Sequence, residues 1–461
     1  MKKHISLITI VCGIAMLLSC KQQPNTSTEE TKDSTRIVFD NVRVIDGNGG
    51  EPIENTSVLI EDGKIKSIGQ NIAAENATHI DLNGKTIMPA LISSHVHIGT
   101  LKSTSTSAEN YTKENILAQL KKYEAYGVLN ILVMGTDRPL LFESGLRDQS
   151  QNGALDGARV HSAGYGFGVE TGGPPVAFGM DRVFRPTSVE QIPAQMDTLK
   201  KLNVEIVKMW VDDFNGKAPK MKPEIYTAII QEAHKRNLRV ASHVYYLADL
   251  KRLIADGIDV IGHSVRDAVI DDETAMQMKA RNIVYIPTLA LDKYAYSYAQ
   301  QPPWINDPFF TTALEPGVYD MITAEKYQND IRKNPLFPVN VKGFETASKN
   351  VKKLSDAGVL LAMGTDSGAT PVRAQGFSEH LELELMVEAG LTPSQAITVA
   401  TLNAAKAIMI DKDFGTLEPG KTADFIVLDA NPLEDIKNTR KIAEVYKAGK
   451  RVGNGPVARQ Q

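Results

Sequence analysis

The feature that most constrains the fold of this 461-residue chain is a regular alternation of short apolar runs with longer helix-period segments. Segments 114–126, 223–236, 247–255 and 343–357 have the helical period. The apolar runs are rich in β-branched residues and lie at 86–88, 129–133, 159–161, 205–208, 238–240, 259–261, 283–286 and 359–362. Strand–helix alternation indicates parallel pairing, and these eight runs match a closed (β/α)8 barrel, an α/β TIM barrel. The alternative is an open doubly wound sheet, which is disfavoured because no glycine-rich phosphate turn follows the first run.

The two ends of the chain have a different pattern, in which short strands alternate with turns. Near the N-terminus the expected strands are 36–39, 57–60 and 65–68, and Asp62-Gly63 between the last two is a hairpin signal. Near the C-terminus they are 414–417, 423–428 and 442–446. Because both ends are β-rich, we predict one small β-sandwich domain from residues 36–86 and 410–456, beside a barrel over 87–409.

The first residues predict export. Lys2 and Lys3 precede an apolar run over 5–18, and Cys20 follows. This pattern predicts a lipoprotein signal peptide over 1–19, with Cys20 as the lipidated first residue of the mature chain. A transmembrane anchor is the alternative, but the run is short for one. Residues 21–35 hold no aliphatic or aromatic side chain, so 20–35 is predicted to be the lipidated cysteine and a flexible tether in the bacterial cell envelope.

The composition limits which partners the protein can be expected to bind and which interactions can stabilise it. The formal net charge is −4 and 23% of residues are charged, so nothing indicates nucleic acid as a partner. The two cysteines are Cys12, which leaves with the signal, and Cys20, which carries lipid. The mature chain therefore has no thiol for a disulfide, and we expect the core and bound metal to stabilise it.

Metal-ligand side chains follow several of the apolar runs. His95 and His97 are two residues apart, which places both on one side of an extended segment. His243 and His263 close the runs before them, and Asp366 follows the eighth. Neutral imidazole is the usual nitrogen ligand of zinc, and the C-terminal strand ends of a TIM barrel form its active-site face. The sequence thus predicts a site for divalent metal, with zinc the expected ion.

Lys208 is the exceptional member of this set. An ammonium group cannot bind a cation, but a lysine near two cations loses its proton readily and reacts with carbon dioxide. The resulting carbamate is a bidentate anion that can bridge two metal ions. The alternative is a barrel lysine paired with Asp212 or Asp213.

The pattern from His95-Val96-His97 to Thr365-Asp366-Ser367-Gly368 resembles the amidohydrolase superfamily over residues 36–455. Lys208 and His243-Val244-Tyr245 are most similar to its branch with a carboxylated lysine, the prolidase-like and imidazolonepropionase-like enzymes. The resemblance implies two ions, one held by His95, His97, Lys208 and Asp366, the other by Lys208, His243 and His263. It also implies that Tyr245 binds a substrate carboxylate, although the neighbouring Tyr246 is a second candidate.

The chain departs from the family pattern at several places. The usual Pro-Gly-Leu-Ile-Asp opening is Pro89-Ala90-Leu91-Ile92-Ser93, which we interpret as altered support for the ligands rather than loss of metal. Arg266, three residues after His263, either contacts a substrate carboxylate or pairs with Asp267. An aromatic insert over 291–340 predicts a lid on the active-site face. Packing against a neighbouring subunit is the alternative, and would make the protein a homo-oligomer.

These residues predict a binuclear amidohydrolase that cleaves a C–N bond of a small molecule, such as a dipeptide or an N-acyl amino acid. Divalent ions lower the pKa of bound water, so hydroxide would attack the carbonyl carbon. Asp366 would take the proton and deliver it to the leaving nitrogen. The same site acting on a lactone, a cyclic ureide or a phosphotriester is an alternative. A non-catalytic exported binding lipoprotein is another, which the presence of Asp366 beside the ligands disfavours.

Overall fold

The structure is a computed structural model that describes residues 36–457. The predicted signal peptide, the lipidated Cys20 and the tether to residue 35 lie outside the described residues. The described residues belong to one compact unit, so the boundary between a β domain and a barrel stays a prediction. In the described part of the chain, no helix is both long and apolar enough to cross a membrane.

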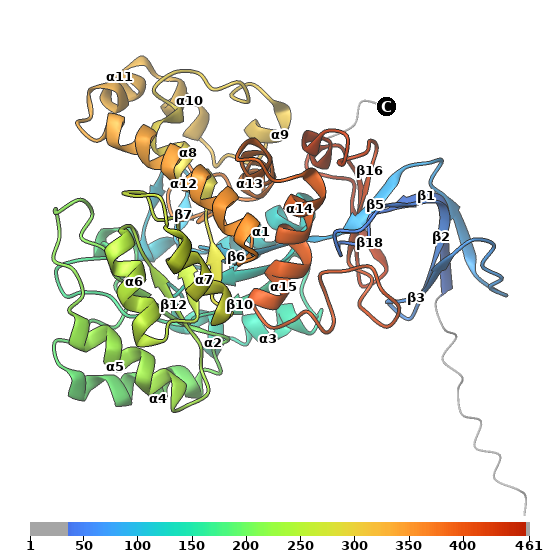
Figure 1. Cartoon of the computed structure of the whole chain (residues 1–461). Coiled ribbons are helices and arrows are strands. Elements are labelled where there is room, and N and C mark those ends of the chain that lie inside the picture. Colours follow the sequence, from blue (N-terminus) through green and yellow to red (C-terminus); the bar gives the residue numbers. More distant parts are fainter. Residues whose placement is uncertain (1–35, 458–461) are drawn as a thin grey trace, which may run out of the picture. The chain divides into compact units, whose positions relative to one another are not determined.

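Strands from both ends of the chain share one sheet (Figure 1). Its central strand β5 pairs in parallel with β1 and antiparallel with β16, which lies far along the sequence. The β2–β3 hairpin turns at Asp62 and Gly63, which both have positive φ as a tight primed turn requires. The eight strands are β1 (Arg36–Val44), β2 (Ile53–Glu61), β3 (Lys64–Gly69), β4 (Thr78–Asp81), β5 (Thr86–Pro89), β16 (Phe425–Leu428), β17 (Ile442–Lys447) and β18 (Lys450–Gly453).

Three details of this sheet differ from expectation. The strands form a single sheet in the described residues, so the predicted sandwich is not confirmed. The expected strand at 414–417 is wrong, because these residues form bends and irregular chain after a turn. The run at 86–88 is a strand, but it belongs to this sheet and not to the parallel strands, whose first member begins two residues after β5, at Leu91.

Eight parallel strands form two further sheets. The order in the first is β10–β9–β6 and in the second β11–β12–β13–β14–β15. Single parallel bridges, Val96 with Ser367 and Phe167 with Met209, connect the segments at the margins of the two sheets. The strands are β6 (Leu91–Val96), β9 (Val128–Val133), β10 (Arg159–Ser162), β11 (Val207–Trp210), β12 (Val240–His243), β13 (Val260–Gly262), β14 (Val284–Ile286) and β15 (Leu360–Leu361).

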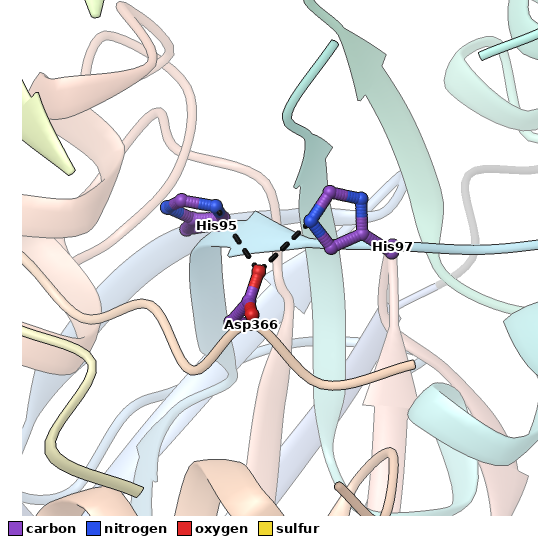
Figure 2. A group of neighbouring side chains, drawn as sticks. All are labelled: His95, His97 and Asp366. Atoms are coloured by element: carbon purple, nitrogen blue, oxygen red, sulfur yellow. Dashed lines mark hydrogen bonds and ion pairs between the residues drawn. The ribbon is translucent and has the colours of Figure 1, made fainter. Parts of the chain in front are cut away.

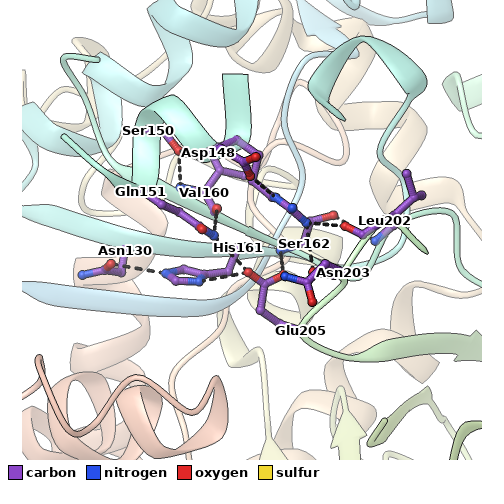
Figure 3. A network of polar contacts seen from close by, with 12 residues as sticks. Asn130, Asp148, Ser150, Gln151, Val160, His161, Ser162, Leu202, Asn203 and Glu205 are labelled. Carbon is purple, nitrogen blue, oxygen red and sulfur yellow. Dashed lines mark hydrogen bonds and ion pairs between the residues drawn. The ribbon is translucent and has the colours of Figure 1, made fainter. Parts of the chain in front are cut away.

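Side chains contribute to the join between β10 and β11, where the structure has no continuous ladder (Figure 3). The Glu205 carboxylate accepts hydrogen bonds from Ser162 N at 2.8 Å and Gln151 Nε2 at 2.9 Å, while Glu205 N donates to Ser162 O. The His161 ring lies between Glu205 and Asn130, 3.4 Å from an oxygen of each. His161 therefore has a structural position in this network.

Helices cover the parallel strands, and some of them begin at a side-chain cap. The Thr112 hydroxyl accepts from Asn115 N at the start of α1, and Asp271 does the same for Thr274 N at α7. The helices are α1 (Lys113–Ala125), α2 (Pro139–Glu143), α3 (Leu146–Gln151), α4 (Ile192–Lys201), α5 (Pro223–His234), α6 (Leu247–Asp256), α7 (Asp272–Ala280), α8 (Leu289–Ser297), α9 (Pro308–Thr311), α10 (Val318–Thr323), α11 (Glu325–Lys333), α12 (Phe337–Ala357), α13 (Phe377–Glu388), α14 (Pro393–Thr398) and α15 (Ala404–Ala407).

The parallel strands have apolar side chains in two separate clusters. One packs under the helices and includes Ile131, Val160 and Ile261. The other gathers alternate residues of different strands, among them Leu132 and Ala241. Successive side chains of each strand point to opposite faces, and both faces are apolar. This explains why the strands appear in the sequence as continuous apolar runs.

Candidate metal centre

His95, His97 and Asp366 meet at one buried point, although their segments are far apart in sequence (Figure 2). Asp366 Oδ1 lies 2.8 Å from His97 Nε2 and 3.4 Å from His95 Nε2. Backbone contacts bring the segments together, because His95 O accepts from Thr365 N and Asp366 N at 3.0 and 2.9 Å. His95 is in β6, whereas Asp366 lies in the loop after β15 rather than at a strand end.

The other two predicted histidine ligands lie beside this group. The His263 ring is 4.5 Å from the His95 ring and 4.4 Å from the His243 ring, between centroids. All four histidines are buried. The structure therefore brings together every histidine that the sequence proposed as a ligand, in the order His97, His95, His263, His243.

Three of these histidines have one ring nitrogen held by a neighbouring oxygen. His97 Nδ1 lies 2.6 Å from Thr136 Oγ1 and His263 Nδ1 2.8 Å from Thr288 Oγ1. His243 Nε2 is 2.9 Å from an Asp212 oxygen. Such partners fix the ring orientation and leave the other nitrogen for a metal ion.

Lys208 is buried and its Nζ has no hydrogen-bond partner among the described residues. Asp212 instead contacts His243, and Asp213 accepts from Tyr246, so the expected alternative of a Lys208–aspartate pair is not what the structure shows. A Cβ on Gly262 would come within 3.2 Å of Lys208 Nζ and 3.3 Å of the His95 ring, so a larger residue there would crowd both groups.

Burial controls the electrostatics of the site. It lowers the pKa of Lys208 to about 7 and that of His95 to about 3, and it lowers the pKa of His243 and His263. Burial opposes ionisation of Asp366, but the adjacent Arg373 guanidinium and the histidines hold its pKa well below the usual range. Neutral imidazoles, an ionised carboxylate and an amine that deprotonates near neutrality form a donor set that fits divalent ions.

Two of the predicted ligands have unusual backbone conformations. His263 has a φ of 72° and Asp366 a φ of 58°, and Thr288, which contacts His263, has a φ of 54°. Residues with side chains rarely adopt this left-handed region, and such positions concentrate at functional sites. Hydrogen bonds to the neighbouring segments hold the Asp366 loop in this conformation.

The site opens into a cavity of about 380 Å³. Pro174 and Pro175, in the segment after β10, line it. The insert after β14 contributes Leu291, Asp292, Ala295, Leu336 and Asn340, while its aromatic residues Tyr294, Tyr298 and Phe310 are buried. The insert is thus a wall of the cavity, and these aromatic rings pack in the main apolar core, where Phe310 contacts Phe377 of α13.

The two predicted substrate-binding residues also line this cavity. Tyr245 faces it, whereas the hydroxyl of Tyr246 donates to Asp213 at 2.8 Å, which separates the two candidate tyrosines. Arg266 pairs with Asp292 at 2.5 Å. The expected pairing with Asp267 is wrong, because the Asp267 carboxylate accepts from Leu247 N at the start of α6.

Sequence reasoning missed several residues of the site. Arg373 contacts Asp366 and lines the cavity, and Thr136 and Thr288 hold histidines. The only sequence signal for the two threonines is their position, because Thr136 and Thr288 come shortly after strands β9 and β14. Nothing in the sequence around Arg373 indicates its contact.

An α/β fold with a buried cluster of histidines and an aspartate is typical of metal-dependent hydrolases. The chain belongs to the amidohydrolase family, which matches residues 86–452. It is accordingly an enzyme of the class that hydrolyses carbon–nitrogen bonds, and the sequence-based resemblance is confirmed.

Individual relatives are distant but cover nearly the whole chain. Ochratoxinase of Aspergillus niger is 24% identical over 95% of this chain and 90% of its own length. Imidazolonepropionase of Deinococcus radiodurans is 25% identical over 86% of this chain and 92% of its own. The solved structure of a Xaa-Pro dipeptidase with bound methionine in the active site is 23% identical and covers 91% of this chain and 100% of its own, with a TM-score of 0.72, a likeness of fold.

Proposed function

We propose that the protein is a binuclear metal-dependent amidohydrolase that cleaves the amide of an N-acyl amino acid or a dipeptide. The observation that carries this proposal is the meeting of four histidines, Asp366 and Lys208 beside one cavity, where Lys208 Nζ has no hydrogen-bond partner among the described residues. His95 also has no hydrogen-bond partner at either ring nitrogen in the described residues. Buried polar atoms left this way are costly unless a further group binds them.

His95, His97, Lys208 and Asp366 would hold one ion, and Lys208, His243 and His263 the other, with zinc the expected metal. Lys208 serves both sets only as a carbamate. Its burial and lowered pKa support this, because an amine that is neutral near pH 7 is the form that reacts with carbon dioxide. The eight parallel strands are proposed to close as a (β/α)8 barrel, supported by the single bridges between their two sheets.

Bound divalent ions supply a hydroxide nucleophile at neutral pH and polarise the scissile carbonyl. Asp366 would take and return the proton, and the position of its Oδ1 beside His95 and His97 supports this role. Asp366→Asn should lower kcat by about 10²–10⁴-fold while the protein still folds. Near-normal kcat in this variant, with an unchanged circular dichroism spectrum, would exclude Asp366 as the proton acceptor.

The cavity lining combines two kinds of side chain that favour an N-acyl amino acid. Tyr245, Arg266 and Arg373 offer donors to a carboxylate, and Arg266 Nη2 is buried without a hydrogen-bond partner in the described chain. The lining also includes the apolar or aromatic residues Phe178, Met180, Trp210 and Phe214. An uncharged acyl group suits these residues better than a free ammonium group does. A lactone, a cyclic ureide or a phosphotriester remains the alternative substrate for the same site.

The deciding experiment is the metal content of the purified protein beside its Lys208→Ala variant. Lys447→Ala, which removes another buried lysine far from the histidines, is the matched control. About two divalent ions per chain, falling sharply only in Lys208→Ala, would support the bridged centre. One ion, unaffected by the change, would contradict the carbamate. No metal in the wild type would contradict the proposed binuclear centre.

We also propose that the protein is exported and held in the bacterial cell envelope by lipid on Cys20. The sequence alone supports this, through the lysines, the apolar run and the cysteine at its end. Cells that express the wild type should incorporate labelled fatty acid into the protein and retain it in the membrane fraction. A Cys20→Ala variant should do neither, and equal labelling of both would contradict the anchor.

A further inference from the structure

We infer that Glu379 is a positioning residue for the metal centre, and that its one carboxylate fixes the strand of His95 against the loop of Asp366. Glu379 is the third residue of α13 and is fully buried. Its Oε1 accepts hydrogen bonds from Thr365 Oγ1 at 2.6 Å, Ser367 Oγ at 2.9 Å and Ser93 Oγ at 3.1 Å. One oxygen atom thus gathers three hydroxyls from two separate segments.

The three hydroxyls that Glu379 binds belong to residues that are close in sequence to the proposed metal ligands. Ser93 is two residues before His95 in β6, and Thr365 and Ser367 stand on either side of Asp366. His97 N also donates to Ser367 O at 2.8 Å, so the two segments already touch through the backbone. Glu379 adds side-chain bonds on both sides of Asp366, whose left-handed φ needs support from its surroundings.

The other oxygen of Glu379 determines where the carboxylate lies. Oε2 accepts from Gly376 N at 2.9 Å, which ties the carboxylate to the first turn of its own helix. Within the described residues, Glu379 has no cationic partner in an ion pair. A buried carboxylate satisfied only by hydroxyls and one amide costs free energy unless all its bonds are made, so its geometry is strongly restrained.

Two other buried glutamates on α13 provide a comparison. Glu382 accepts from Leu289 N and Ala290 N, and Glu384 contacts Arg440. Neither bonds a residue that flanks Asp366. Glu384→Gln is therefore the matched control. It removes a buried acid from the same helix without touching the segments that carry His95 and Asp366.

The test compares Glu379→Gln with Glu384→Gln in the full-length protein by two readouts. The first is zinc affinity, measured by competition with a chelator. The second is hydrogen exchange of the metal-free protein over residues 91–97 and 362–369. In Glu379→Gln an amide NH₂ replaces one acceptor, so it faces either Gly376 N–H or the hydroxyls. We expect zinc affinity to fall about 10–100-fold and exchange to quicken in those two segments only.

Thr365→Val keeps the inference testable if Glu379→Gln does not fold. It removes one of the three hydroxyls and should give a smaller loss of zinc affinity with the same local exchange. The inference rests on the metal site proposed above, but hydrogen exchange is measured on the metal-free protein. A wild type that binds no zinc would overturn the metal site, and exchange alone would then decide the positioning role. Zinc affinity and exchange equal to those of Glu384→Gln would overturn it.

Discussion

Thr136, Asp212 and Thr288 each hold one ring nitrogen of a histidine in the metal centre. None of them is predicted by a ligand motif, because a hydroxyl or carboxylate that contacts a histidine has no fixed spacing from it in sequence. The ligands themselves were predictable, since each comes within a few residues of an apolar run. At the scale of single residues, the sequence therefore predicts which atoms are candidate ligands, and the structure adds what orients them.

Thr136→Val should weaken metal binding. It removes the hydroxyl 2.6 Å from His97 Nδ1 and leaves the imidazole free to rotate or change tautomer. Loss of such a partner lowers metal affinity about 10–100-fold. The measurement is chelator competition, with Thr401→Val as control, because that buried hydroxyl bonds Ile397 O within a helical segment. Equal affinities of the two variants would contradict the role of Thr136.

Asp137→Asn should reduce the dependence of stability on pH. Burial raises the pKa of Asp137 to about 7 from 3.8, although Ser162 and Tyr111 hydrogen-bond it. Between these values the native carboxyl holds its proton and the unfolded one does not, so the wild type loses stability as pH rises through this window.

The check for Asp137 is a set of thermal melts of both proteins from about pH 5 to 8. The wild-type Tm should decline more steeply than that of Asp137→Asn. Other buried acids whose pKa values are raised, such as Glu382 and Glu384, contribute equally to both proteins and cancel in the difference. Parallel curves would contradict the raised pKa of Asp137.

Among the elements, helices with a clear period were predicted closely. The expected helices at 114–126 and 247–255 correspond to α1 (Lys113–Ala125) and α6 (Leu247–Asp256). The strands were harder to predict where two apolar runs follow each other closely in the sequence. β5 and β6 are separated only by Ala90, and an apolar run does not show which sheet it joins. Pairing with β16, which decides this, is a long-range contact.

Glu205→Gln should destabilise the join between β10 and β11. Both oxygens of Glu205 accept hydrogen bonds from this region, and an amide nitrogen would face either Ser162 N or Gln151 Nε2, which are themselves donors. A buried donor left unsatisfied costs about 1–3 kcal/mol. Urea denaturation measures the loss, and a change below about 0.5 kcal/mol, typical of surface positions, would contradict the proposed importance of the network.

At the scale of the whole molecule, a buried ion pair connects the two kinds of sheet. Arg159 in β10 contacts Asp424, the residue before β16, and Asp424 also accepts from Ala448 N at 2.7 Å. Removing one partner of a buried pair leaves the other charged and unpaired. The sequence indicated strands at both ends of the chain, but not this contact, because its two residues are far apart in sequence.

Arg159→Met should lower the free energy of unfolding by about 3–5 kcal/mol. The double variant Arg159→Met/Asp424→Asn should recover part of the loss, since it removes the unpaired carboxylate charge. Urea melts of the wild type, both single variants and the double variant give the coupling energy. Additive losses would show that the pair has no energetic connection of its own.

The position of β5 between β1 and β16 also bears on how the chain acquires its structure during synthesis. When β1 and β5 leave the ribosome, the edge of β5 that will pair with β16 has no partner. At about 5–20 residues per second, translation reaches Phe425 only after some tens of seconds. Throughout that interval the nascent chain exposes an apolar strand edge, so its early handling by chaperones should matter more than that of proteins whose neighbouring strands are also neighbours in sequence.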